Sequence, residues 1–317
     1  MFYKGNGICF MKILGFSQIR NICAEKGKYP PGKKLTDKYV DSFVSKLSNA
    51  PRAKKLEPVD INTIFLQEPI SLPQTKAETS LIKSLMPSEK YCIFLPGGTS
   101  NTTNYQDLYK SLSYNNINVL PVEYYGYGLN KNMQASYEKY IEVAEDAYKY
   151  LTDTLKVSPK NITIMGYCLG GWPACTLAKK FDHKALLLIN PLTRLSEVSE
   201  GYITSKNVTE DFSLLEKLWT NTSFFKKKIS SKFSSLKDLD QINCPVYIMS
   251  SKKDPVMASK FINIFKNKMA QQNENVTYLQ DFETGHSLTK NKINIIANML
   301  TGDIYKENSS FGFFNLY

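Results

Sequence analysis

The residues best suited to covalent chemistry are a cysteine, an aspartate and a histidine that follow one another along the chain. Cys168 lies at the centre of the string Gly-Tyr-Cys-Leu-Gly-Gly, Asp254 precedes a proline, and His286 follows a glycine. A thiolate can attack a carbonyl carbon, an imidazole can move the proton, and a carboxylate can orient the imidazole. The three residues therefore predict nucleophilic catalysis through an acyl-cysteine.

The segment around Cys168 predicts a sharp turn from a strand into a helix. An apolar run, Ile162–Met165, leads into the glycine-rich string Gly166–Gly171, and a helix-compatible segment follows. Glycines flank the nucleophile in such a turn because the chain passes close to itself there. Pro173 is compatible with the helix, since the N–H groups of a first turn lack intrahelical acceptors. The turn leaves Cys168 exposed at a helix N-terminus, where a thiolate is favoured.

Four further segments occur in the order found in the α/β-hydrolases, and the chain resembles that superfamily from roughly Leu56 to Leu300. They are an apolar strand running into a glycine turn (Tyr91–Thr99), a Tyr-Gly-Tyr-Gly stretch (Val119–Gly128), a strand leading to the aspartate (Pro245–Pro255) and the histidine loop (Thr284–His286). The Tyr-Gly-Tyr-Gly stretch is similar to that of Bem46-like serine hydrolases. The cysteine elbow resembles that of the dienelactone hydrolases and polyester synthases, which also have cysteine where most relatives have serine.

The resemblance implies an α/β-hydrolase fold: an α/β architecture with a mostly parallel, doubly wound sheet, helices on both faces and a small helical cap. The chain has 317 residues, 42% of them hydrophobic, which is enough for one large core. Strand-like and helical patterns alternate over residues 90–190, and Ala135–Leu155 has the apolar spacing of an amphipathic helix. Asp254 and His286 would then join Cys168 at the edge where the parallel strands end.

Two segments lie outside this pattern. Residues 1–56 are predicted to form an N-terminal extension with a short amphipathic helix at Thr36–Ala50, and residues 57–317 to form the hydrolase domain. The extension is either an appendage packed on the domain or an arm that binds a partner. Within the domain, residues 192–243 are too long for a loop and, by the resemblance, form a cap over the site. Apolar residues such as Trp219 and Phe225 either attach this cap to the core or contact the substrate.

The resemblance also implies two backbone N–H donors for the oxyanion that forms when a carbonyl is attacked. They belong to Leu169, next to the nucleophile, and to Gly98, in the glycine turn. Pro96 replaces the histidine usual in the family, so Thr99 remains an alternative donor. Further contacts with the substrate are expected from Thr99, Tyr167, Trp219 and Phe225.

Two of the predicted catalytic positions have rivals in the sequence. His183 is the other histidine, but it falls in a polar connection between a helix and a strand, which favours His286 as the base. Asp281 and Glu283 could supply the carboxylate, although the position of Asp254 directly after a predicted strand favours it.

Composition argues against several other classes of protein. The net charge is +11, but Arg20, Arg52 and Arg194 are the only arginines, and no nucleic-acid-binding module is recognisable, so we expect no nucleic-acid partner. The six cysteines have no zinc-type spacing, and Cys92 and Cys175 fall in apolar patterns. We therefore expect neither a disulfide framework nor a metal site, and no organic cofactor is implied.

Targeting signals are not recognisable either. The apolar run from Ile8 to Phe16 is interrupted by Lys12 and is not followed by a cleavage site of small residues. No stretch reaches the ~18 apolar residues of a membrane span. We therefore expect a cytoplasmic protein without a transmembrane segment, in a reducing compartment that keeps Cys168 as a thiol.

A cysteine nucleophile narrows the range of substrates. A thiolate leaves more readily than an alkoxide, so the tetrahedral intermediate returns to reactants unless the substrate's own leaving group is also good. The sequence therefore predicts a hydrolase of ester, thioester or lactone bonds in small molecules. Two alternatives remain: an acyltransferase of the polyester-synthase kind that uses the same acyl-enzyme, and a binding protein on a hydrolase scaffold. The Pro-Gly-Gly and Tyr-Gly-Tyr-Gly stretches disfavour the first, and the complete set of triad residues disfavours the second.

Overall fold

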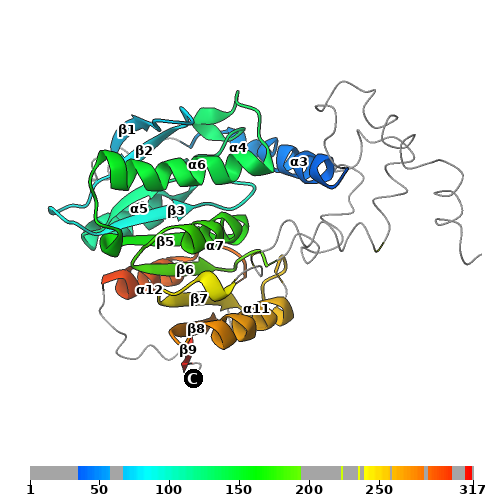
Figure 1. Ribbon diagram of the computed structural model, residues 1–317, viewed down its shortest axis with the longest axis vertical. Helices are drawn as coiled ribbons and strands as arrows, with labels where there is room; N and C mark the ends of the chain where they lie inside the picture. The colour runs from blue at the N-terminus through cyan, green and yellow to red at the C-terminus, as the bar shows by residue number, and fades with distance from the viewer. Residues whose placement is uncertain are drawn as a thin grey trace, which may run out of the picture.

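The computed structural model describes residues 35–57, 67–193, 223, 235, 239–257, 259–281, 285–301 and 311–315. Within these residues, nine strands form one sheet in the order β1-β2-β4-β3-β5-β6-β7-β8-β9 (Figure 1). The strands are β1 (Gln67–Ser71), β2 (Glu78–Ile82), β3 (Tyr91–Leu95), β4 (Asn118–Pro121), β5 (Ile162–Tyr167), β6 (Ala185–Ile189), β7 (Val246–Ser251), β8 (Val276–Asp281) and β9 (Phe311–Asn315).

The central strands, from β4 to β8, run parallel to one another. Antiparallel pairs occur only toward the margins of the described sheet, where β2 pairs with β1 and β4, and β9 pairs with β8. The chain order reverses at β3, which has β4 on one side and β5 on the other. Such a reversal opens a crevice beyond the carboxyl ends of the strands, and this is where open parallel sheets place their sites.

Helices cover both faces of the sheet, as predicted for a doubly wound fold (Figure 1). They are α3 (Leu35–Ser48), α4 (Pro51–Lys54), α5 (Gln106–Tyr114), α6 (Tyr137–Lys149), α7 (Gly171–Lys180), α11 (Ser259–Gln272) and α12 (Lys290–Thr301). Ile93 and Leu95 face the apolar core shared with α6, α7 and α11, whereas Cys92 and Phe94 face the core shared with α5 and α12. No helix in the described ranges is long and apolar enough to cross a membrane.

The predicted amphipathic helix at Ala135–Leu155 is confirmed as α6, which continues into a π-helical turn, Tyr150–Thr154. Ser136 caps its N-terminus by accepting a hydrogen bond from the Lys139 N–H. Its buried face contains Tyr140, Val143 and Ala144, and the helix is where the apolar spacing placed it.

Residues 35–57 pack on the sheet domain. The apolar residues of α3 (Val40, Phe43, Val44 and Leu47) are all buried in the same core as α6 and α7. The side chain of Asn101, which follows β3, donates to the carbonyls of Arg52, Ala53 and Lys55 at 3.1, 3.2 and 2.7 Å. These three hydrogen bonds, called the clasp of Asn101 below, join the end of α4 to the loop that follows β3.

The hairpin of β1 and β2 and the strand β9 are not among the predicted elements. Gln67 of β1 is opposite Ile82 of β2, and nearly all of β1 is exposed. An exposed marginal strand does not need the buried apolar run by which a central strand is recognised, so local sequence gives little sign of it.

Most of the predicted cap, residues 192–243, lies outside the described residues, and so do Trp219 and Phe225. Ser235, one of its few described residues, hydrogen-bonds to the residues after β6. The backbone N–H of Ser235 donates to the Thr193 carbonyl at 3.0 Å, and its hydroxyl donates to the Leu192 carbonyl at 2.7 Å. Ser235 is thus attached to the residues that directly follow β6.

Candidate active site

Cys168 lies in the predicted sharp turn between β5 and α7. Its backbone has a φ of 51°, in the left-handed region that residues other than glycine rarely adopt. A Cβ on Gly170 would stand 2.0 Å from the Leu95 carbonyl oxygen, so only glycine allows β3 and the turn to approach so closely. The Leu192 N–H donates to the Cys168 carbonyl at 2.8 Å and holds the strained turn from the neighbouring strand. The side chain of Cys168 remains partly exposed.

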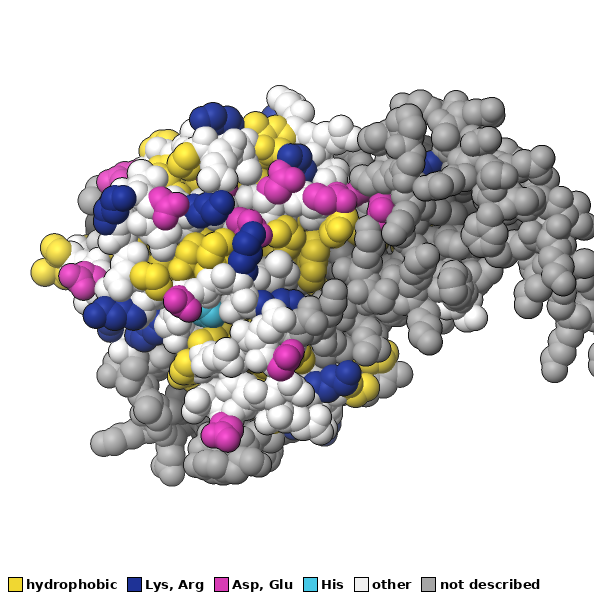
Figure 2. Space-filling model, in the orientation of Figure 1, with side chains coloured by type: hydrophobic (Ala, Val, Ile, Leu, Met, Phe, Trp, Pro, Cys, Tyr) yellow, Lys and Arg dark blue, Asp and Glu magenta, His cyan; other side chains and the backbone are white. Residues whose placement is uncertain are grey.

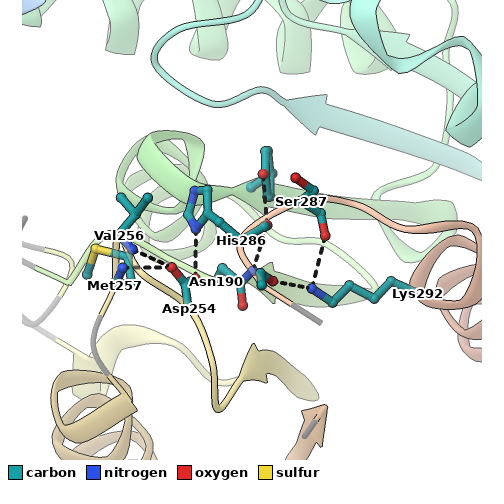
Figure 3. A network of polar contacts seen from close by, with 9 residues as sticks. Asn190, Asp254, Val256, Met257, His286, Ser287 and Lys292 are labelled. Carbon is teal, nitrogen blue, oxygen red and sulfur yellow. Dashed lines mark hydrogen bonds and ion pairs between the residues drawn. The ribbon is translucent and has the colours of Figure 1, made fainter. Parts of the chain in front are cut away.

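Asp254 and His286 meet at this edge of the sheet (Figure 3). Asp254 Oδ2 lies 2.7 Å from His286 Nδ1. Asp254 Oδ1 accepts hydrogen bonds from the backbone N–H groups of Val256 and Met257 at 2.8 and 2.9 Å. The carboxylate is almost wholly buried, with 1% of the side chain exposed. Because both oxygens are held, Asp254 has one orientation, and it keeps the Nδ1 proton on its own side of the ring. The Nε2 atom is then left on the side of the ring away from Asp254.

The electrostatic environment of His286 favours the charged imidazolium. Burial by itself would lower the pKa of His286, but the negative charge of Cys168, the hydrogen bonds with Asp254 and Cys168 and the charge of Asp254 outweigh it and raise the pKa to about 10. The His286 imidazole therefore lies between Cys168 and Asp254 and hydrogen-bonds with both.

The glycine turn after β3 lies beside the nucleophile. The Gly97 N–H donates to the Tyr105 hydroxyl at 3.2 Å, and the Gly98 carbonyl accepts from the Tyr127 hydroxyl at 2.6 Å. Within the described residues, no backbone carbonyl accepts a hydrogen bond from the Gly98 N–H. The Leu169 N–H is in the first turn after the nucleophile, where helical N–H groups have no intrahelical acceptor. The two predicted oxyanion donors belong to different turns that lie side by side, since a Cβ built on Gly98 would stand 3.4 Å from Leu169 Cβ. The alternative donor Thr99 is exposed.

Tyr167, the last residue of β5, and Asn190, directly after β6, hold the backbone of His286. The Tyr167 hydroxyl donates to the His286 carbonyl at 2.9 Å. The Asn190 side-chain amide donates to the same carbonyl at 2.9 Å (Figure 3). The predicted substrate contact of Tyr167 is neither supported nor opposed by this hydrogen bond. Asn190 is absent from the predicted site. The signal for it in the sequence is a polar residue directly after the apolar run Ala185–Ile189, between the strands that lead to Cys168 and to Asp254.

The rivals of the predicted residues lie elsewhere or outside the described atoms. His183 lies at the opposite edge of the sheet, where its Nδ1 is 2.8 Å from the Phe181 carbonyl and its Nε2 is 2.9 Å from Cys244 Sγ. Burial lowers the pKa of His183 and raises that of Cys244 to about 11, so this pair is neutral. Glu283 and the side chain of Asp281 are not described.

Two further cysteines, and an aromatic residue near the elbow, pack in the core. Cys92 and Cys175 are fully buried, as predicted. Trp172, in the first turn of α7, stacks on Tyr137 of α6 with ring centroids 5.7 Å apart. Among the described residues, no group of three or more His, Cys, Asp or Glu side chains could hold a metal ion.

The family model described as "Dienelactone hydrolase family" matches residues 128–299, a range that contains Cys168, Asp254 and His286. The chain is 27% identical over 201 residues to an uncharacterized protein of Acanthamoeba polyphaga mimivirus, covering 60% of this chain and 65% of that protein. It is 25% identical over 186 residues to the lysophosphatidylserine lipase ABHD12 of Danio rerio, covering 55% and 46%. The chain thus spans less than two thirds of the length of these two relatives.

Solved structures with the same fold include an esterase of Pyrococcus furiosus and an alpha-beta hydrolase of Vibrio vulnificus. The first has a TM-score of 0.58 at 18% identity and covers 81% of this chain and 95% of its own. The second has a TM-score of 0.59 at 18% identity and covers 86% and 93%. At such low identity these two likenesses show the fold. The family match covers more than half of the chain, so this α/β-hydrolase belongs to the dienelactone hydrolase family.

Proposed function

We propose that the protein is a Cys-His-Asp hydrolase that cleaves ester, thioester or lactone bonds in small molecules through an acyl-enzyme on Cys168. The observation that carries the proposal is the hydrogen-bonded pair of Asp254 and His286 at the sheet edge where the strained elbow presents the thiol. The family, whose name denotes lactone hydrolysis, supports this reaction class, and the esterase of similar fold is consistent with it.

In the first half-reaction, Cys168 attacks the carbonyl carbon of the substrate as a thiolate. A C–S bond forms, the carbonyl electron pair moves to oxygen, and the N–H groups of Gly98 and Leu169 stabilise that oxyanion. As the intermediate collapses, the bond to the leaving group breaks, and the His286 imidazolium gives its proton to the departing oxygen or sulfur. Asp254 stabilises the imidazolium before the transfer.

In the second half-reaction, His286 is neutral and accepts a proton from a water molecule as that water attacks the acyl-thioester. The second tetrahedral intermediate collapses by breaking the C–S bond, which releases the carboxylic acid product and returns Cys168 as a thiolate beside the imidazolium. The departing thiolate needs no proton donor, because it is returned beside the His286 imidazolium, which holds the proton taken from water.

The leaving group decides which substrates react. Thiolate expulsion competes with expulsion of the substrate's own group, so thioesters, enol lactones and activated esters are expected to acylate Cys168 faster than simple alkyl esters. Amides are expected to be poor substrates for the same reason.

The test is a mass measurement on the intact protein mixed with a p-nitrophenyl acyl ester. We expect a mass increase of one acyl group on Cys168 and a burst of p-nitrophenol. Cys168→Ala should show neither. Cys244→Ala is the matched control, because Cys244 is the other partly exposed cysteine of the described residues and should not be acylated.

Three outcomes separate the candidate functions. Release of free acid by water identifies a hydrolase. An acyl-enzyme that is stable in water but passes its acyl group to an added alcohol or thiol identifies an acyltransferase. If wild type forms no adduct with any activated ester, and Cys168→Ala binds the same compounds equally well, the protein is a binding protein and the proposal is wrong.

A further inference from the structure

Lys292 is a lysine in an unfavourable position. It is the third residue of α12, and its relative exposure is 0%. Burial removes the hydration of an ammonium group, and a cation in the first turn of a helix lies at the positive end of the helix dipole. An apolar residue of similar size would avoid both penalties, and α12 has such residues at its other buried positions, including Ile293 and Ile296.

The ammonium group of Lys292 binds the loop that contains His286 (Figure 3). Its Nζ donates to the Gly285 carbonyl at 2.7 Å and to the Ser287 carbonyl at 2.9 Å. These are the residues immediately before and after the histidine. One side chain therefore holds both backbone carbonyls that flank His286.

The loop is not held by the shape of its glycine. A Cβ on Gly285 would lie 3.8 Å from its nearest neighbours, the Lys253 carbonyl oxygen and Pro255 Cδ, which is ordinary contact. The backbone of Gly285 is also outside the positive-φ region. Hydrogen bonds to carbonyls, rather than steric restriction, therefore determine the course of the backbone here.

We infer that Lys292 is a positioning residue that holds the His286 imidazole between Asp254 and Cys168 by binding the carbonyls on either side of it. The inference rests on the proposed triad, but it concerns the geometry of the imidazole and not ester cleavage. Three consecutive carbonyls are bound in this loop, those of 285 and 287 by Lys292 and that of 286 by Tyr167 and Asn190. Without Lys292 the backbone could pivot about the central carbonyl, and the ring would move off its two partners.

Alkylation of Cys168 by iodoacetamide tests this inference without any ester substrate. The variants are Lys292→Met, which keeps the length but removes the donors, Lys292→Arg, which keeps donors and charge, and Lys290→Met, which removes an exposed lysine from the same helix. Labelling of Cys168 is followed by peptide mass at pH 7 and at pH 10, well below the thermal midpoint of every variant. His286→Ala sets the rate without the imidazole.

At pH 7 we expect Lys292→Met to label about 10- to 100-fold more slowly than wild type, because misplacing a catalytic group by about 1 Å costs this much. Lys292→Arg should recover most of the rate, and Lys290→Met should match wild type. At pH 10 the rates should converge, because a thiol ionises there without help from an imidazole. A general loss of structure would not give this dependence on pH.

Wild-type labelling at pH 7 in every folded Lys292 variant overturns the inference. Lys292→Gln is made alongside, because its amide keeps one polar donor at the site if Lys292→Met does not fold. The Gln side chain is too short to reach both carbonyls, so its rate at pH 7 should still fall. If Lys292→Met slows labelling as expected while wild type cleaves no ester, the proposed function is wrong and the positioning role of Lys292 is not.

Discussion

The side chain of Leu47 occupies the space that a side chain on Gly98 would need. A Cβ built on Gly98 would stand 2.8 Å from Leu47 Cδ1 and 2.9 Å from Leu169 Cδ2. Leu47 belongs to α3, so the helix before the sheet domain packs directly against the loop that carries a proposed oxyanion donor. The position of the Gly98 N–H therefore depends on a contact between segments far apart in the sequence.

Gly98→Ala should displace this loop and weaken the oxyanion site. We expect the burst with a p-nitrophenyl ester to slow by about 10²- to 10³-fold, the loss found when one oxyanion donor is removed. Adding Leu47→Ala should recover part of the rate, because the new methyl group then has space on one side, and the double-mutant cycle measures this coupling. Gly285→Ala, which places a methyl group in ordinary contact, is the control. A Gly98→Ala variant with an unchanged burst would remove this N–H from the proposed site.

The raised pKa of His286 predicts the alkaline limit of acylation. The imidazolium must be present to protonate the leaving group, and its pKa is about 10, so kcat/KM should stay high through pH 9 and fall near pH 10. The same shift in pKa makes the stability of the fold depend on pH. The contribution of His286 to the stability of the folded state is complete below its unfolded pKa of 6.5 and is lost as the pH rises through about 10.

Asp254→Asn should move that alkaline limit toward neutral pH, because the carboxylate no longer raises the pKa of His286. The rate of acylation should fall as well, by up to about 10⁴-fold in a comparable triad. Stopped-flow burst rates from pH 6 to pH 11 measure both effects. If the alkaline limit is unchanged in Asp254→Asn, Asp254 does not raise the pKa of His286.

The buried carboxyl group of Glu123 should also make the stability of the fold depend on pH. Burial raises its pKa to about 8, although the hydroxyl and N–H of Thr102, at 2.6 and 3.3 Å, oppose the shift. The folded state then holds a proton that the unfolded state has lost, so this contribution is complete below pH 4.5 and disappears as the pH rises through about 8.

Glu123→Gln, which stays neutral, should therefore gain stability relative to wild type between pH 5 and pH 9. The difference in the free energy of unfolding should reach the order of a few kcal/mol. Urea unfolding across this range measures it, with the exposed Glu142→Gln as control. A constant difference between wild type and Glu123→Gln at all pH values would show that Glu123 titrates normally in the folded protein.

The clasp of Asn101 predicts how residues 35–57 are attached. Asn101→Ala leaves three carbonyls of α4 and its C-terminal residue without their donor, and we expect a loss of about 1–3 kcal/mol in the free energy of unfolding. Hydrogen exchange should increase in residues 35–57 and in the loop after β3. Asn115→Ala, which removes an asparagine at the end of α5, should leave this segment protected. Equal exchange in both variants would mean that α3 alone holds the segment.

Local sequence determined several of the elements, and it predicts the type of chemistry. The apolar run before Gly166 and the glycines after Cys168 specify a strand, a turn and a helix, because no other arrangement accommodates those residues within a few positions. Likewise, the apolar spacing of Val40, Phe43, Val44 and Leu47 specifies one buried helical face, which the structure confirms. These are short-range properties, and hydrophobic periodicity and glycine content report them directly.

Only the tertiary structure decided which groups meet. Nothing in the segment around Lys292 indicates that its ammonium reaches two carbonyls, because a lysine in a first helical turn is ordinarily solvated. The contact of Leu47 with Gly98, and the two donors on the His286 carbonyl, join segments far apart in sequence. Such contacts depend on how the sheet brings the carboxyl ends of its strands together. The local spacing of apolar residues does not indicate which of these ends lie close to one another. The sequence determined a cysteine elbow with a histidine and a carboxylate to follow, and packing determined which carboxylate holds the imidazole and what holds the histidine in place.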